Sequence, residues 1–425
     1  MPFLFLVLYN LILILALPLL APYLAWRLFS GKETKESLLC KLGFYGKNPA
    51  PEGVIWIHAV SVGEVNTAAP LAELLEEREK KPIVFSVSTQ TGMETAKARL
   101  GGKVHLTWFP LDFPFAVSRA LARFSPSAVV FLETELWPNF ILAAKKSGIK
   151  CAVANGRISD KSFANYKTTG HLIGPVLRQV SLFMMQSADD AERISKMGAD
   201  AGRIAVTGNI KFDRPAPART SKESAMKIFK IPAGAKTVVF ASTHPGEDEI
   251  FLQTAKNISS AETGFFFVIA PRHVTRSKDV AALCEKFGFA PATRSSGMEC
   301  EKYSVLVLDT MGELAKLYEA VDVAVMGGSF VPHGGQNPLE ASAWGAPVLF
   351  GPHMENFREI SQKLLEAGAG KLAADGAELE KLLLEWLANE DSARFAGEQG
   401  IKTVENNRGA LEKTVRLLDQ LLKNG

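Results

Sequence analysis

Residues 327–340 read Gly-Gly-Ser-Phe-Val-Pro-His-Gly-Gly-Gln-Asn-Pro-Leu-Glu and follow an apolar run, residues 322–326, that is typical of a buried strand. Glycines allow positive φ and let a phosphate approach backbone N–H groups, and a helix N-terminus adds about half a positive charge. Asn337 suits the cap and Pro338 the first position of such a helix. Glu340, just inside it, is placed to accept hydrogen bonds from both hydroxyls of a ribose. The pattern predicts a strand, loop and helix that bind a nucleotide; the alternative is a loop whose glycines only shape a turn.

The length of 425 residues exceeds what one ordinary core holds, so we expect two domains. The chain has 48 lysines and arginines against 45 acidic residues, and this net charge of +3 does not predict nucleic-acid binding. The seven histidines are dispersed, so we expect no metal site. The four cysteines lie far apart, at Cys40, Cys151, Cys284 and Cys300. This spacing predicts neither a zinc site nor a disulfide framework, and it fits a reducing compartment.

The N-terminal segment 1–30 is a candidate membrane anchor. Residues 2–26 carry no charge, and this run of 25 residues is long enough to cross a hydrocarbon core of about 30 Å. A cleaved signal peptide, the alternative, would have basic residues ahead of the apolar run. Pro18 and Pro22 also allow a helix that enters only one leaflet. The basic residues come after the run, which predicts a cytoplasmic globular part: Arg27, Lys32, Lys35, Lys41 and Lys47.

After Pro49-Ala50-Pro51, short apolar runs alternate with amphipathic segments, which predicts an α/β fold around a parallel sheet. Glu64 lies between the first run and a helix expected at about 66–80. Open α/β sheets bind their ligands at the carboxyl ends of the strands, so Glu64 is either a general base or a plain helix cap. The strands expected in this half are 54–58, 83–88, 104–108, 128–132, 151–154 and 182–185.

A second candidate site is the loop at 133–139, which reads Glu-Thr-Glu-Leu-Trp-Pro-Asn after an expected strand. It brings two carboxylates, Glu133 and Glu135, and Trp137 to the carboxyl end of the sheet. The alternative is a helix cap with an aromatic staple. Lys211, near the end of this half, could place a cation beside a departing phosphate or could be a solvated surface lysine.

The clearest linker is 214–218, Arg-Pro-Ala-Pro-Ala, because two prolines favour extended backbone. We therefore expect one domain at 31–213 and another at 214–425, whose last helix could pack back on the first domain. The βα pattern restarts after the linker and ends in helices. The strands expected are 237–242, 265–270, 304–308, 322–326 and 348–350, and the closing helices are 376–389 and 410–422.

Arg272 follows an expected strand and could hold a phosphate or carboxylate by two parallel hydrogen bonds, or it could be a surface arginine. The loop at 309–314 offers further backbone donors. The chain has no Walker loop, no serine nucleophile elbow and no Asp-x-Asp pair.

Five segments together resemble the Kdo transferase family, the 3-deoxy-D-manno-octulosonic acid transferases of lipid A assembly. The resemblance runs from the membrane segment to the C-terminal helix. It implies a GT-B architecture, two Rossmann-like domains facing across a cleft, with the acceptor on the N-terminal domain and CMP-Kdo on the C-terminal one. The segments are 58–64, 133–139, 208–211, 271–273 and 327–340.

The resemblance also implies the site and the reaction. Glu64 would act as general base in an inverting transfer to lipid IVA, and Glu133 and Lys211 would stabilise the transition state. Because CMP carries a single phosphate, no metal or other cofactor is expected. The place of action would be the bacterial inner membrane, in lipopolysaccharide synthesis. The residues implied to bind the CMP moiety are Pro271, Arg272, Met311, Gly312, Glu313, Asn337, Pro338, Leu339 and Glu340.

Two other functions remain open from the residues. One is a GT-B enzyme that uses a UDP-sugar, or a related epimerase, but the anchor and the 133–139 loop argue against it. The other is a membrane-tethered, non-catalytic binder of nucleotide sugars, which would not require Glu64.

Overall fold

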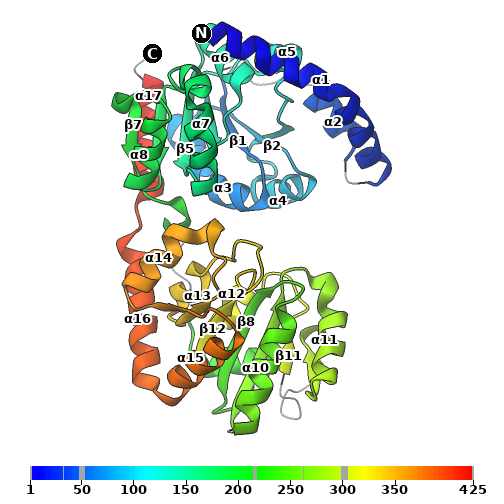
Figure 1. Cartoon of the computed structure of the whole chain (residues 1–425), viewed down its shortest axis with the longest axis vertical. Coiled ribbons are helices and arrows are strands. Elements are labelled where there is room, and N and C mark those ends of the chain that lie inside the picture. The colour runs from blue at the N-terminus through cyan, green and yellow to red at the C-terminus, as the bar shows by residue number, and fades with distance from the viewer. Residues whose placement is uncertain are drawn as a thin grey trace. The chain divides into compact units, whose positions relative to one another are not determined.

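The computed structural model describes residues 2–31, 33–46, 53–213, 218–261, 263–297 and 305–423. The chain forms two compact units: unit 1 comprises Met1–Asp213 with Arg408–Gly425, and unit 2 comprises Arg214–Asn407 (Figure 1). The predicted linker lies outside the described residues except for Ala218, as do Pro49-Ala50-Pro51, Lys32 and Lys47.

Unit 1 is built on a seven-stranded parallel sheet with the order β3-β2-β1-β4-β5-β6-β7. The six predicted strands are present. The seventh, β7, was not predicted because it is a three-residue, partly exposed edge strand without an apolar run. The strands are β1 Ile55–Ala59, β2 Ile83–Val87, β3 His105–Trp108, β4 Ala128–Leu132, β5 Lys150–Gly156, β6 Leu182–Met185 and β7 Ile204–Val206.

Helices cover both faces of this sheet, so its central strands are buried and mostly apolar. Side chains alternate along β1: Trp56 enters one core, with Phe131 and Phe140, while Ile55 and Ile57 enter the other. The helices of unit 1 are α1 Pro2–Phe29, α2 Lys35–Lys41, α3 Val62–Glu79, α4 Gln90–Leu100, α5 Pro114–Phe124, α6 Pro138–Lys146, α7 Asp160–Leu177, α8 Ala188–Lys196 and α17 Ala410–Lys423, with the 3-10 turns Ala201–Arg203 and Ile210–Asp213.

The last helix, α17, belongs to unit 1, and the expectation for 214–425 had allowed this helix to pack back on the first domain. Its buried Val415 and Leu418 join the core beneath α3. The Asp213 carboxylate accepts the N–H groups of Gly409 and Leu411 and so ties the start of α17 to the end of the first half. Burial of this apolar helix face outweighs continuity along the chain.

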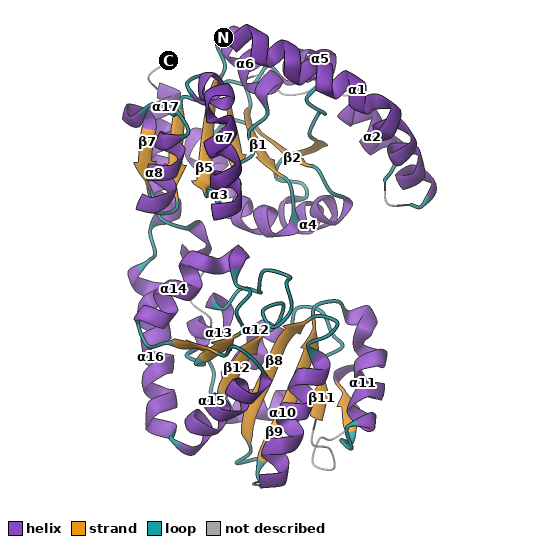
Figure 2. Cartoon of the chain, in the orientation of Figure 1, coloured by secondary structure: helices purple, strands orange, loops and turns teal. Residues whose placement is uncertain are grey.

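Unit 2 repeats the plan of strands packed between helices (Figure 2). Its parallel sheet has seven strands in the order β10-β11-β9-β8-β12-β13-β14. The short strands β10 and β14 and the helix α16 were not predicted. The strands are β8 Lys236–Thr243, β9 Phe265–Pro271, β10 Pro291–Thr293, β11 Val305–Val307, β12 Val323–Met326, β13 Val348–Phe350 and β14 Gly370–Leu372. The helices are α9 Lys222–Phe229, α10 Asp248–Ala261, α11 Ser277–Lys286, α12 Leu314–Leu317, α13 Leu339–Trp344, α14 Arg358–Glu366, α15 Gly376–Ala388 and α16 Glu390–Asn406, with 3-10 turns at Val274–Arg276, Arg294–Ser296, Tyr318–Ala320 and Glu355–Phe357.

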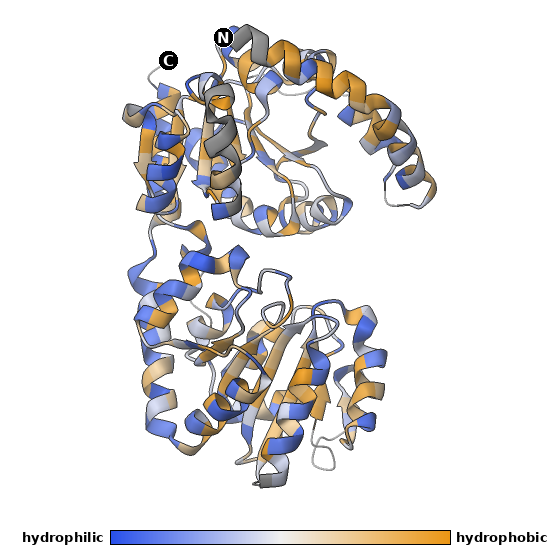
Figure 3. Cartoon of the chain, viewed as in Figure 1, coloured by the Kyte–Doolittle hydropathy of each residue, from blue (hydrophilic) through white to orange (hydrophobic). Residues whose placement is uncertain are grey.

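The N-terminal helix α1 is apolar for most of its length (Figure 3). Among the described residues no single helix meets the length and hydropathy expected of a membrane span. Leu6–Leu20 and Pro22–Phe29 meet them together, by length and composition, across a bend of 45°. Prolines inside the helix break its hydrogen bonding and account for such a bend. Large apolar side chains of α1 are exposed, among them Ile12, Leu15, Leu19 and Phe29.

Polar side chains hold α1 against the rest of unit 1. Tyr9 donates to the Asp112 carboxylate at 2.9 Å, and Asn10 and Asn139 exchange side-chain hydrogen bonds at 3.0 and 2.8 Å. The same carboxylate accepts the backbone N–H groups of Asn139 and Phe140 at the start of α6. The helix is therefore attached near its N-terminal end as well as through the chain that follows it.

Candidate active site

Glu64 lies in the first turn of α3, which begins at Val62 and not at about residue 66 as predicted. Its carboxylate accepts the backbone N–H of Val60 at 2.8 Å and the hydroxyl of Ser61 at 3.1 Å. These bonds resemble those of a helix cap, the alternative left open above. They also fix the carboxylate at the carboxyl end of β1, where α/β sheets bind ligands.

The surroundings of Glu64 make it an unusually basic carboxylate. Burial raises its pKa from the ordinary 4.5 to about 7, and the charges of Glu133 and Glu135 add to the rise, against the hydrogen bonds from Val60 and Ser61. A general base works best when its pKa lies near the working pH, because it is then both available and basic. A helix cap needs no such pKa, so this environment favours the catalytic interpretation.

The pKa of Glu133 is shifted in the opposite direction. Burial acts to raise its pKa, but the charges of Lys211 and Arg157 outweigh burial and keep the pKa below the ordinary value. Lys211 Nζ lies 2.9 Å from Glu133 Oε1, and the two side chains are only 15% and 20% exposed. Glu133 also has a positive φ of 56°, which non-glycine residues seldom adopt and which often marks a functional site. The structure thus brings Glu64, Glu133 and Lys211 into one electrostatic cluster.

Lys211 is positioned by amide side chains that sequence reasoning did not single out. The side chain of Asn155 accepts the N–H of Ile210 at 2.9 Å, and Asn209 accepts the N–H of Lys211 at 3.0 Å. Gln186 bridges the two, since it donates to the carbonyl of Asn155 and accepts from Asn209. The available signal was an amide residue at the end of β5, Asn155, and one after each of β6 and β7, Gln186 and Asn209.

Trp137, in contrast, fits the alternative in which the 133–139 loop is a helix cap with an aromatic staple. Its ring packs on that of Phe109 with centroids 5.6 Å apart, so it fastens the 133–139 loop to the core. Glu135 beside it has a raised pKa because of burial and the charge of Glu133.

The residues predicted to bind CMP lie in unit 2, after β9, β11 and β12, at the carboxyl edge of the sheet. Pro271 ends β9, and the Arg272 side chain is exposed while its N–H bonds to the carbonyl of Thr243 at 3.0 Å. Met311 is 82% exposed, and Gly312 has a φ of 83°.

Glu313 is already engaged within unit 2. Arg294 binds its carboxylate through two nitrogens, with a closest distance of 2.8 Å, and lowers its pKa. Thr310 donates to the same carboxylate. The side chain of Glu313 therefore shapes its own loop, and the loop's backbone is what remains for a ligand.

The glycine-rich stretch differs from its prediction in two ways. Helix α13 begins at Leu339, not at Pro338, although the side chain of Asn337 does accept the N–H of Leu339 at 3.2 Å. The helix has only six residues, so its dipole is weaker than expected. Glu340 lies half-buried in its first turn.

The second difference concerns the backbone donors of the loop. The N–H groups of Gly328, Ser329 and Phe330 point at the carboxylate of Glu247, at 2.7 to 2.9 Å. They are consequently not available to a phosphate, whereas the glycine pattern had implied that they would bind one. The protein's own buried carboxylate takes that place.

Three histidine rings, none of them among the predicted site residues, gather at the glycine-rich loop. His244 stacks on His333 with centroids 4.4 Å apart, and His273 lies edge-on at 6.4 Å. Burial lowers the pKa of His244 to about 4, with smaller contributions from the two histidines and Arg272. The side chain of Gln336 contacts His244 Nε2 at 3.0 Å. The available signal was the Thr243-His244-Pro245 sequence, which begins at the last residue of β8.

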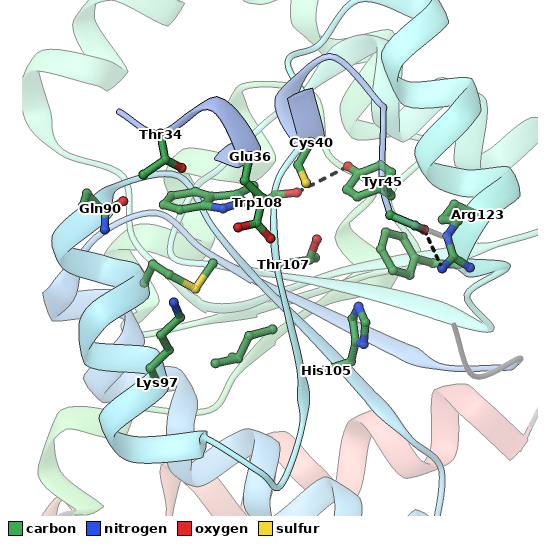
Figure 4. A pocket seen from close by; sticks show the side chains of 14 residues that line it. Thr34, Glu36, Cys40, Tyr45, Gln90, Lys97, His105, Thr107, Trp108 and Arg123 are labelled. Carbon is green, nitrogen blue, oxygen red and sulfur yellow. Dashed lines mark hydrogen bonds between the residues drawn. The ribbon is translucent and has the colours of Figure 1, made fainter. Parts of the chain in front are cut away.

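A pocket of about 260 Å³ lies elsewhere in unit 1, against the edge strand β3 (Figure 4). Tyr45 bonds to the carbonyl of Trp108 at 3.3 Å and Arg123 to that of Gly46 at 3.1 Å at its wall. None of the predicted site residues lines it; the lining includes Glu36, Cys40, Gln90, Lys97, His105 and Thr107. We therefore place the candidate active site at the Glu64 cluster and not in this pocket.

Two Rossmann-like units, each with its candidate residues at the carboxyl edge of a parallel sheet, place the chain in the GT-B fold class. A solved glycosyltransferase from Rickettsia africae is 14% identical with a TM-score of 0.60, over 88% of this chain and 98% of that one. The UDP-GlcNAc 2-epimerase from Neisseria meningitidis is 15% identical with a TM-score of 0.59, over 87% and 99%. These two likenesses concern the fold alone.

The chain belongs to the family of 3-deoxy-D-manno-octulosonic acid transferases. The family described as 3-Deoxy-D-manno-octulosonic-acid transferase (kdotransferase) matches residues 36–214. The 3-deoxy-D-manno-octulosonic acid transferase of Haemophilus influenzae is 34% identical over 98% of both chains. That of Bordetella pertussis is 33% identical over 88% of this chain and 89% of the relative.

Proposed function

We propose that this enzyme transfers Kdo from CMP-Kdo to a hydroxyl of the lipid A precursor lipid IVA, with inversion at the anomeric carbon. The observation that carries the mechanism is the pair of oppositely tuned carboxylates, Glu64 with a pKa of about 7 and Glu133 paired with Lys211. Family membership supports the choice of Kdo as the transferred sugar. It also weighs against a UDP-sugar enzyme or an epimerase.

In the proposed reaction, Glu64 takes the proton of the attacking hydroxyl while the new bond to the anomeric carbon forms. The bond from that carbon to the CMP phosphate oxygen breaks, and CMP leaves with the electron pair. A sugar hydroxyl is a poor nucleophile at neutral pH, so a positioned base contributes on the order of 10²–10⁴ in rate. Lys211 supplies fixed positive charge where negative charge develops. We assign CMP recognition to unit 2, with Arg272 as the cation for its phosphate.

The test is turnover. The purified chain is incubated with CMP-Kdo and lipid IVA, CMP release is followed with and without acceptor, and the product is weighed by mass spectrometry. Release that requires acceptor, with a product heavier by Kdo, supports the proposal. Binding of CMP-Kdo without any turnover would favour the non-catalytic binder, and turnover of a UDP-sugar instead would favour the other GT-B enzyme.

We further propose that α1 attaches the enzyme to the cytoplasmic face of the bacterial inner membrane. The exposed apolar side chains of α1 support attachment, and Arg27 and Lys35 after the apolar run support a cytoplasmic globular part. Protease treatment of right-side-out vesicles should spare both units until the vesicles are lysed. Digestion before lysis would contradict this orientation.

A further inference from the structure

Glu247 is a fully buried carboxylate with no role in the reaction described so far. It lies between β8 and α10 and is 0% exposed. One of its oxygens accepts the N–H groups of His244 and Gly328 at 2.9 and 2.7 Å, and the other accepts those of Ser329 and Phe330, both at 2.9 Å. Four backbone donors from two separate loops thus converge on a single side chain.

Such an arrangement fixes backbone strongly. Hydrogen bonds to an ionised group are roughly twice as strong as those between neutral groups, and a buried charge without partners is very costly. The loop after β12 can therefore move only if the carboxylate loses three of its four partners. The loop is also tightly packed, because a Cβ on Gly327 would lie 2.4 Å from the carbonyl oxygen of Ser242.

The fixed segment sets the position of the residues that follow it. The carbonyl of Gly328 accepts the N–H of Gly335 at 2.8 Å, which closes the loop just before Gln336 and Asn337. Gln336 in turn contacts the ring of His244, and the backbone N–H of His244 donates to the Glu247 carboxylate. The Glu247 carboxylate thus holds the backbone of both loops that make this contact.

We propose that Glu247 is a positioning residue of the donor site. Its carboxylate holds the 328–330 backbone and the backbone of His244 in the one arrangement that presents Gln336, Asn337 and Arg272 together at the carboxyl edge of the unit 2 sheet. It does not touch the substrate. This inference rests on the proposed function, since it takes CMP as the ligand of that edge.

Glu247→Gln is the decisive variant because it keeps the size of the side chain. In either orientation of the amide, its NH₂ group faces two backbone N–H donors, so one pair of donors loses its acceptor. We expect the Kd for CMP to rise at least tenfold. The KM for CMP-Kdo should rise more than kcat falls, and the pH dependence of kcat should stay where it is in the wild type.

Asp322→Asn is the matched control. Asp322 is a carboxylate of the same unit that accepts the N–H of Thr237 at 2.8 Å and pairs with Lys222, but it lies at the amino end of β12. Its loss should lower the melting temperature and leave CMP affinity within about twofold. Equal weakening of CMP binding by both variants would show a general loss of stability and overturn the inference.

A second variant keeps the inference testable if Glu247→Gln does not fold. Ser329→Ala leaves Glu247 intact and removes the hydroxyl that bonds to the carbonyl of Met326 and to the N–H of Gly351. We expect faster hydrogen exchange at residues 328–330 and a several-fold weaker affinity for CMP. Unchanged CMP affinity despite faster exchange would overturn the inference. A wild-type chain that binds no CMP would instead overturn the proposed donor. The exchange measurement does not depend on CMP, so the two failures can be told apart.

Discussion

Two glutamates of unit 1 show how neighbours set the chemistry of one residue type. Glu64 and Glu133 are both partly buried, and burial acts to raise the pKa of each. Glu133 has Lys211 at 2.9 Å and remains an anion, whereas Glu64 faces other carboxylates and reaches a pKa of about 7. Such a separation of two pKa values is how carboxylates take different roles in one site.

Replacing Glu64 with glutamine should remove the base and little else. Turnover is expected to fall by about 10²–10⁴, since the amide cannot accept the proton. The cost in stability should be about 1 kcal/mol or less, as for a lost helix cap. Turnover, CMP-Kdo binding and melting temperature are measured on one preparation. A variant that keeps more than about a tenth of wild-type turnover would defeat the assignment.

The pH dependence follows from the same residue. Only the deprotonated form of Glu64 is a base, so kcat/KM should rise with pH through about 7 and then level off. Stability should change in the opposite direction. Between the ordinary pKa of 4.5 and about 7, the unfolded chain ionises this group and the folded chain does not, so the wild type loses stability relative to Glu64→Gln as pH rises. A rate profile flat from pH 5 to 9 would contradict the base role.

At the scale of elements, the two ends of the chain are both tied to unit 1. Helix α1 is attached through Tyr9 and Asn10, and α17 packs on α3 and β5. Neither contact follows from periodicity, because each depends on partners more than 100 residues away, such as Asp112 for Tyr9.

The attachment of α1 predicts where the N-terminus lies. Because Tyr9 and Asn10 bond to the globular part of unit 1, we expect the first turns of α1 to stay on the same side of the membrane as that unit. A tag placed before Met1 should react with an impermeant reagent only after right-side-out vesicles are lysed. Labelling of intact vesicles would show that α1 crosses the bilayer.

The packing of α17 predicts which unit it stabilises. Leu418 is 1% exposed in the core beneath α3, so Leu418→Ala should lower the free energy of unfolding by about 2–5 kcal/mol. The affinity for CMP should not change, since α17 belongs to unit 1. Arg416→Ala, at an exposed position of the same helix, is the control and should change stability by less than about 0.5 kcal/mol. A shift in CMP affinity alone would argue against this assignment.

At the scale of the whole molecule, we expect the full chain to bind CMP without a divalent metal, because one phosphate can be neutralised by Arg272 and by backbone donors of the 309–314 loop. Calorimetry in EDTA measures this directly. Glu340→Gln should weaken CMP by about 1.5–3 kcal/mol, the usual value of hydrogen bonds to a charged group. Binding that requires Mg²⁺, or an unchanged affinity in the variant, would contradict the donor site as drawn.

Short apolar runs alternating with helical segments were enough to predict two α/β units, and five motifs in order were enough to indicate the family. Both signals are local: strand and helix periods are written in neighbouring residues, and motif residues keep their order. Tertiary structure decided the rest. The partner of the glycine-rich loop is Glu247, 81 residues before Gly328. The raised pKa of Glu64 comes first from burial and then from the charges of Glu133 and Glu135, and packing on α3 and β5 decides that α17 joins the first unit. Burial, Coulomb interactions and packing act between residues that only folding brings together, so no local pattern records them.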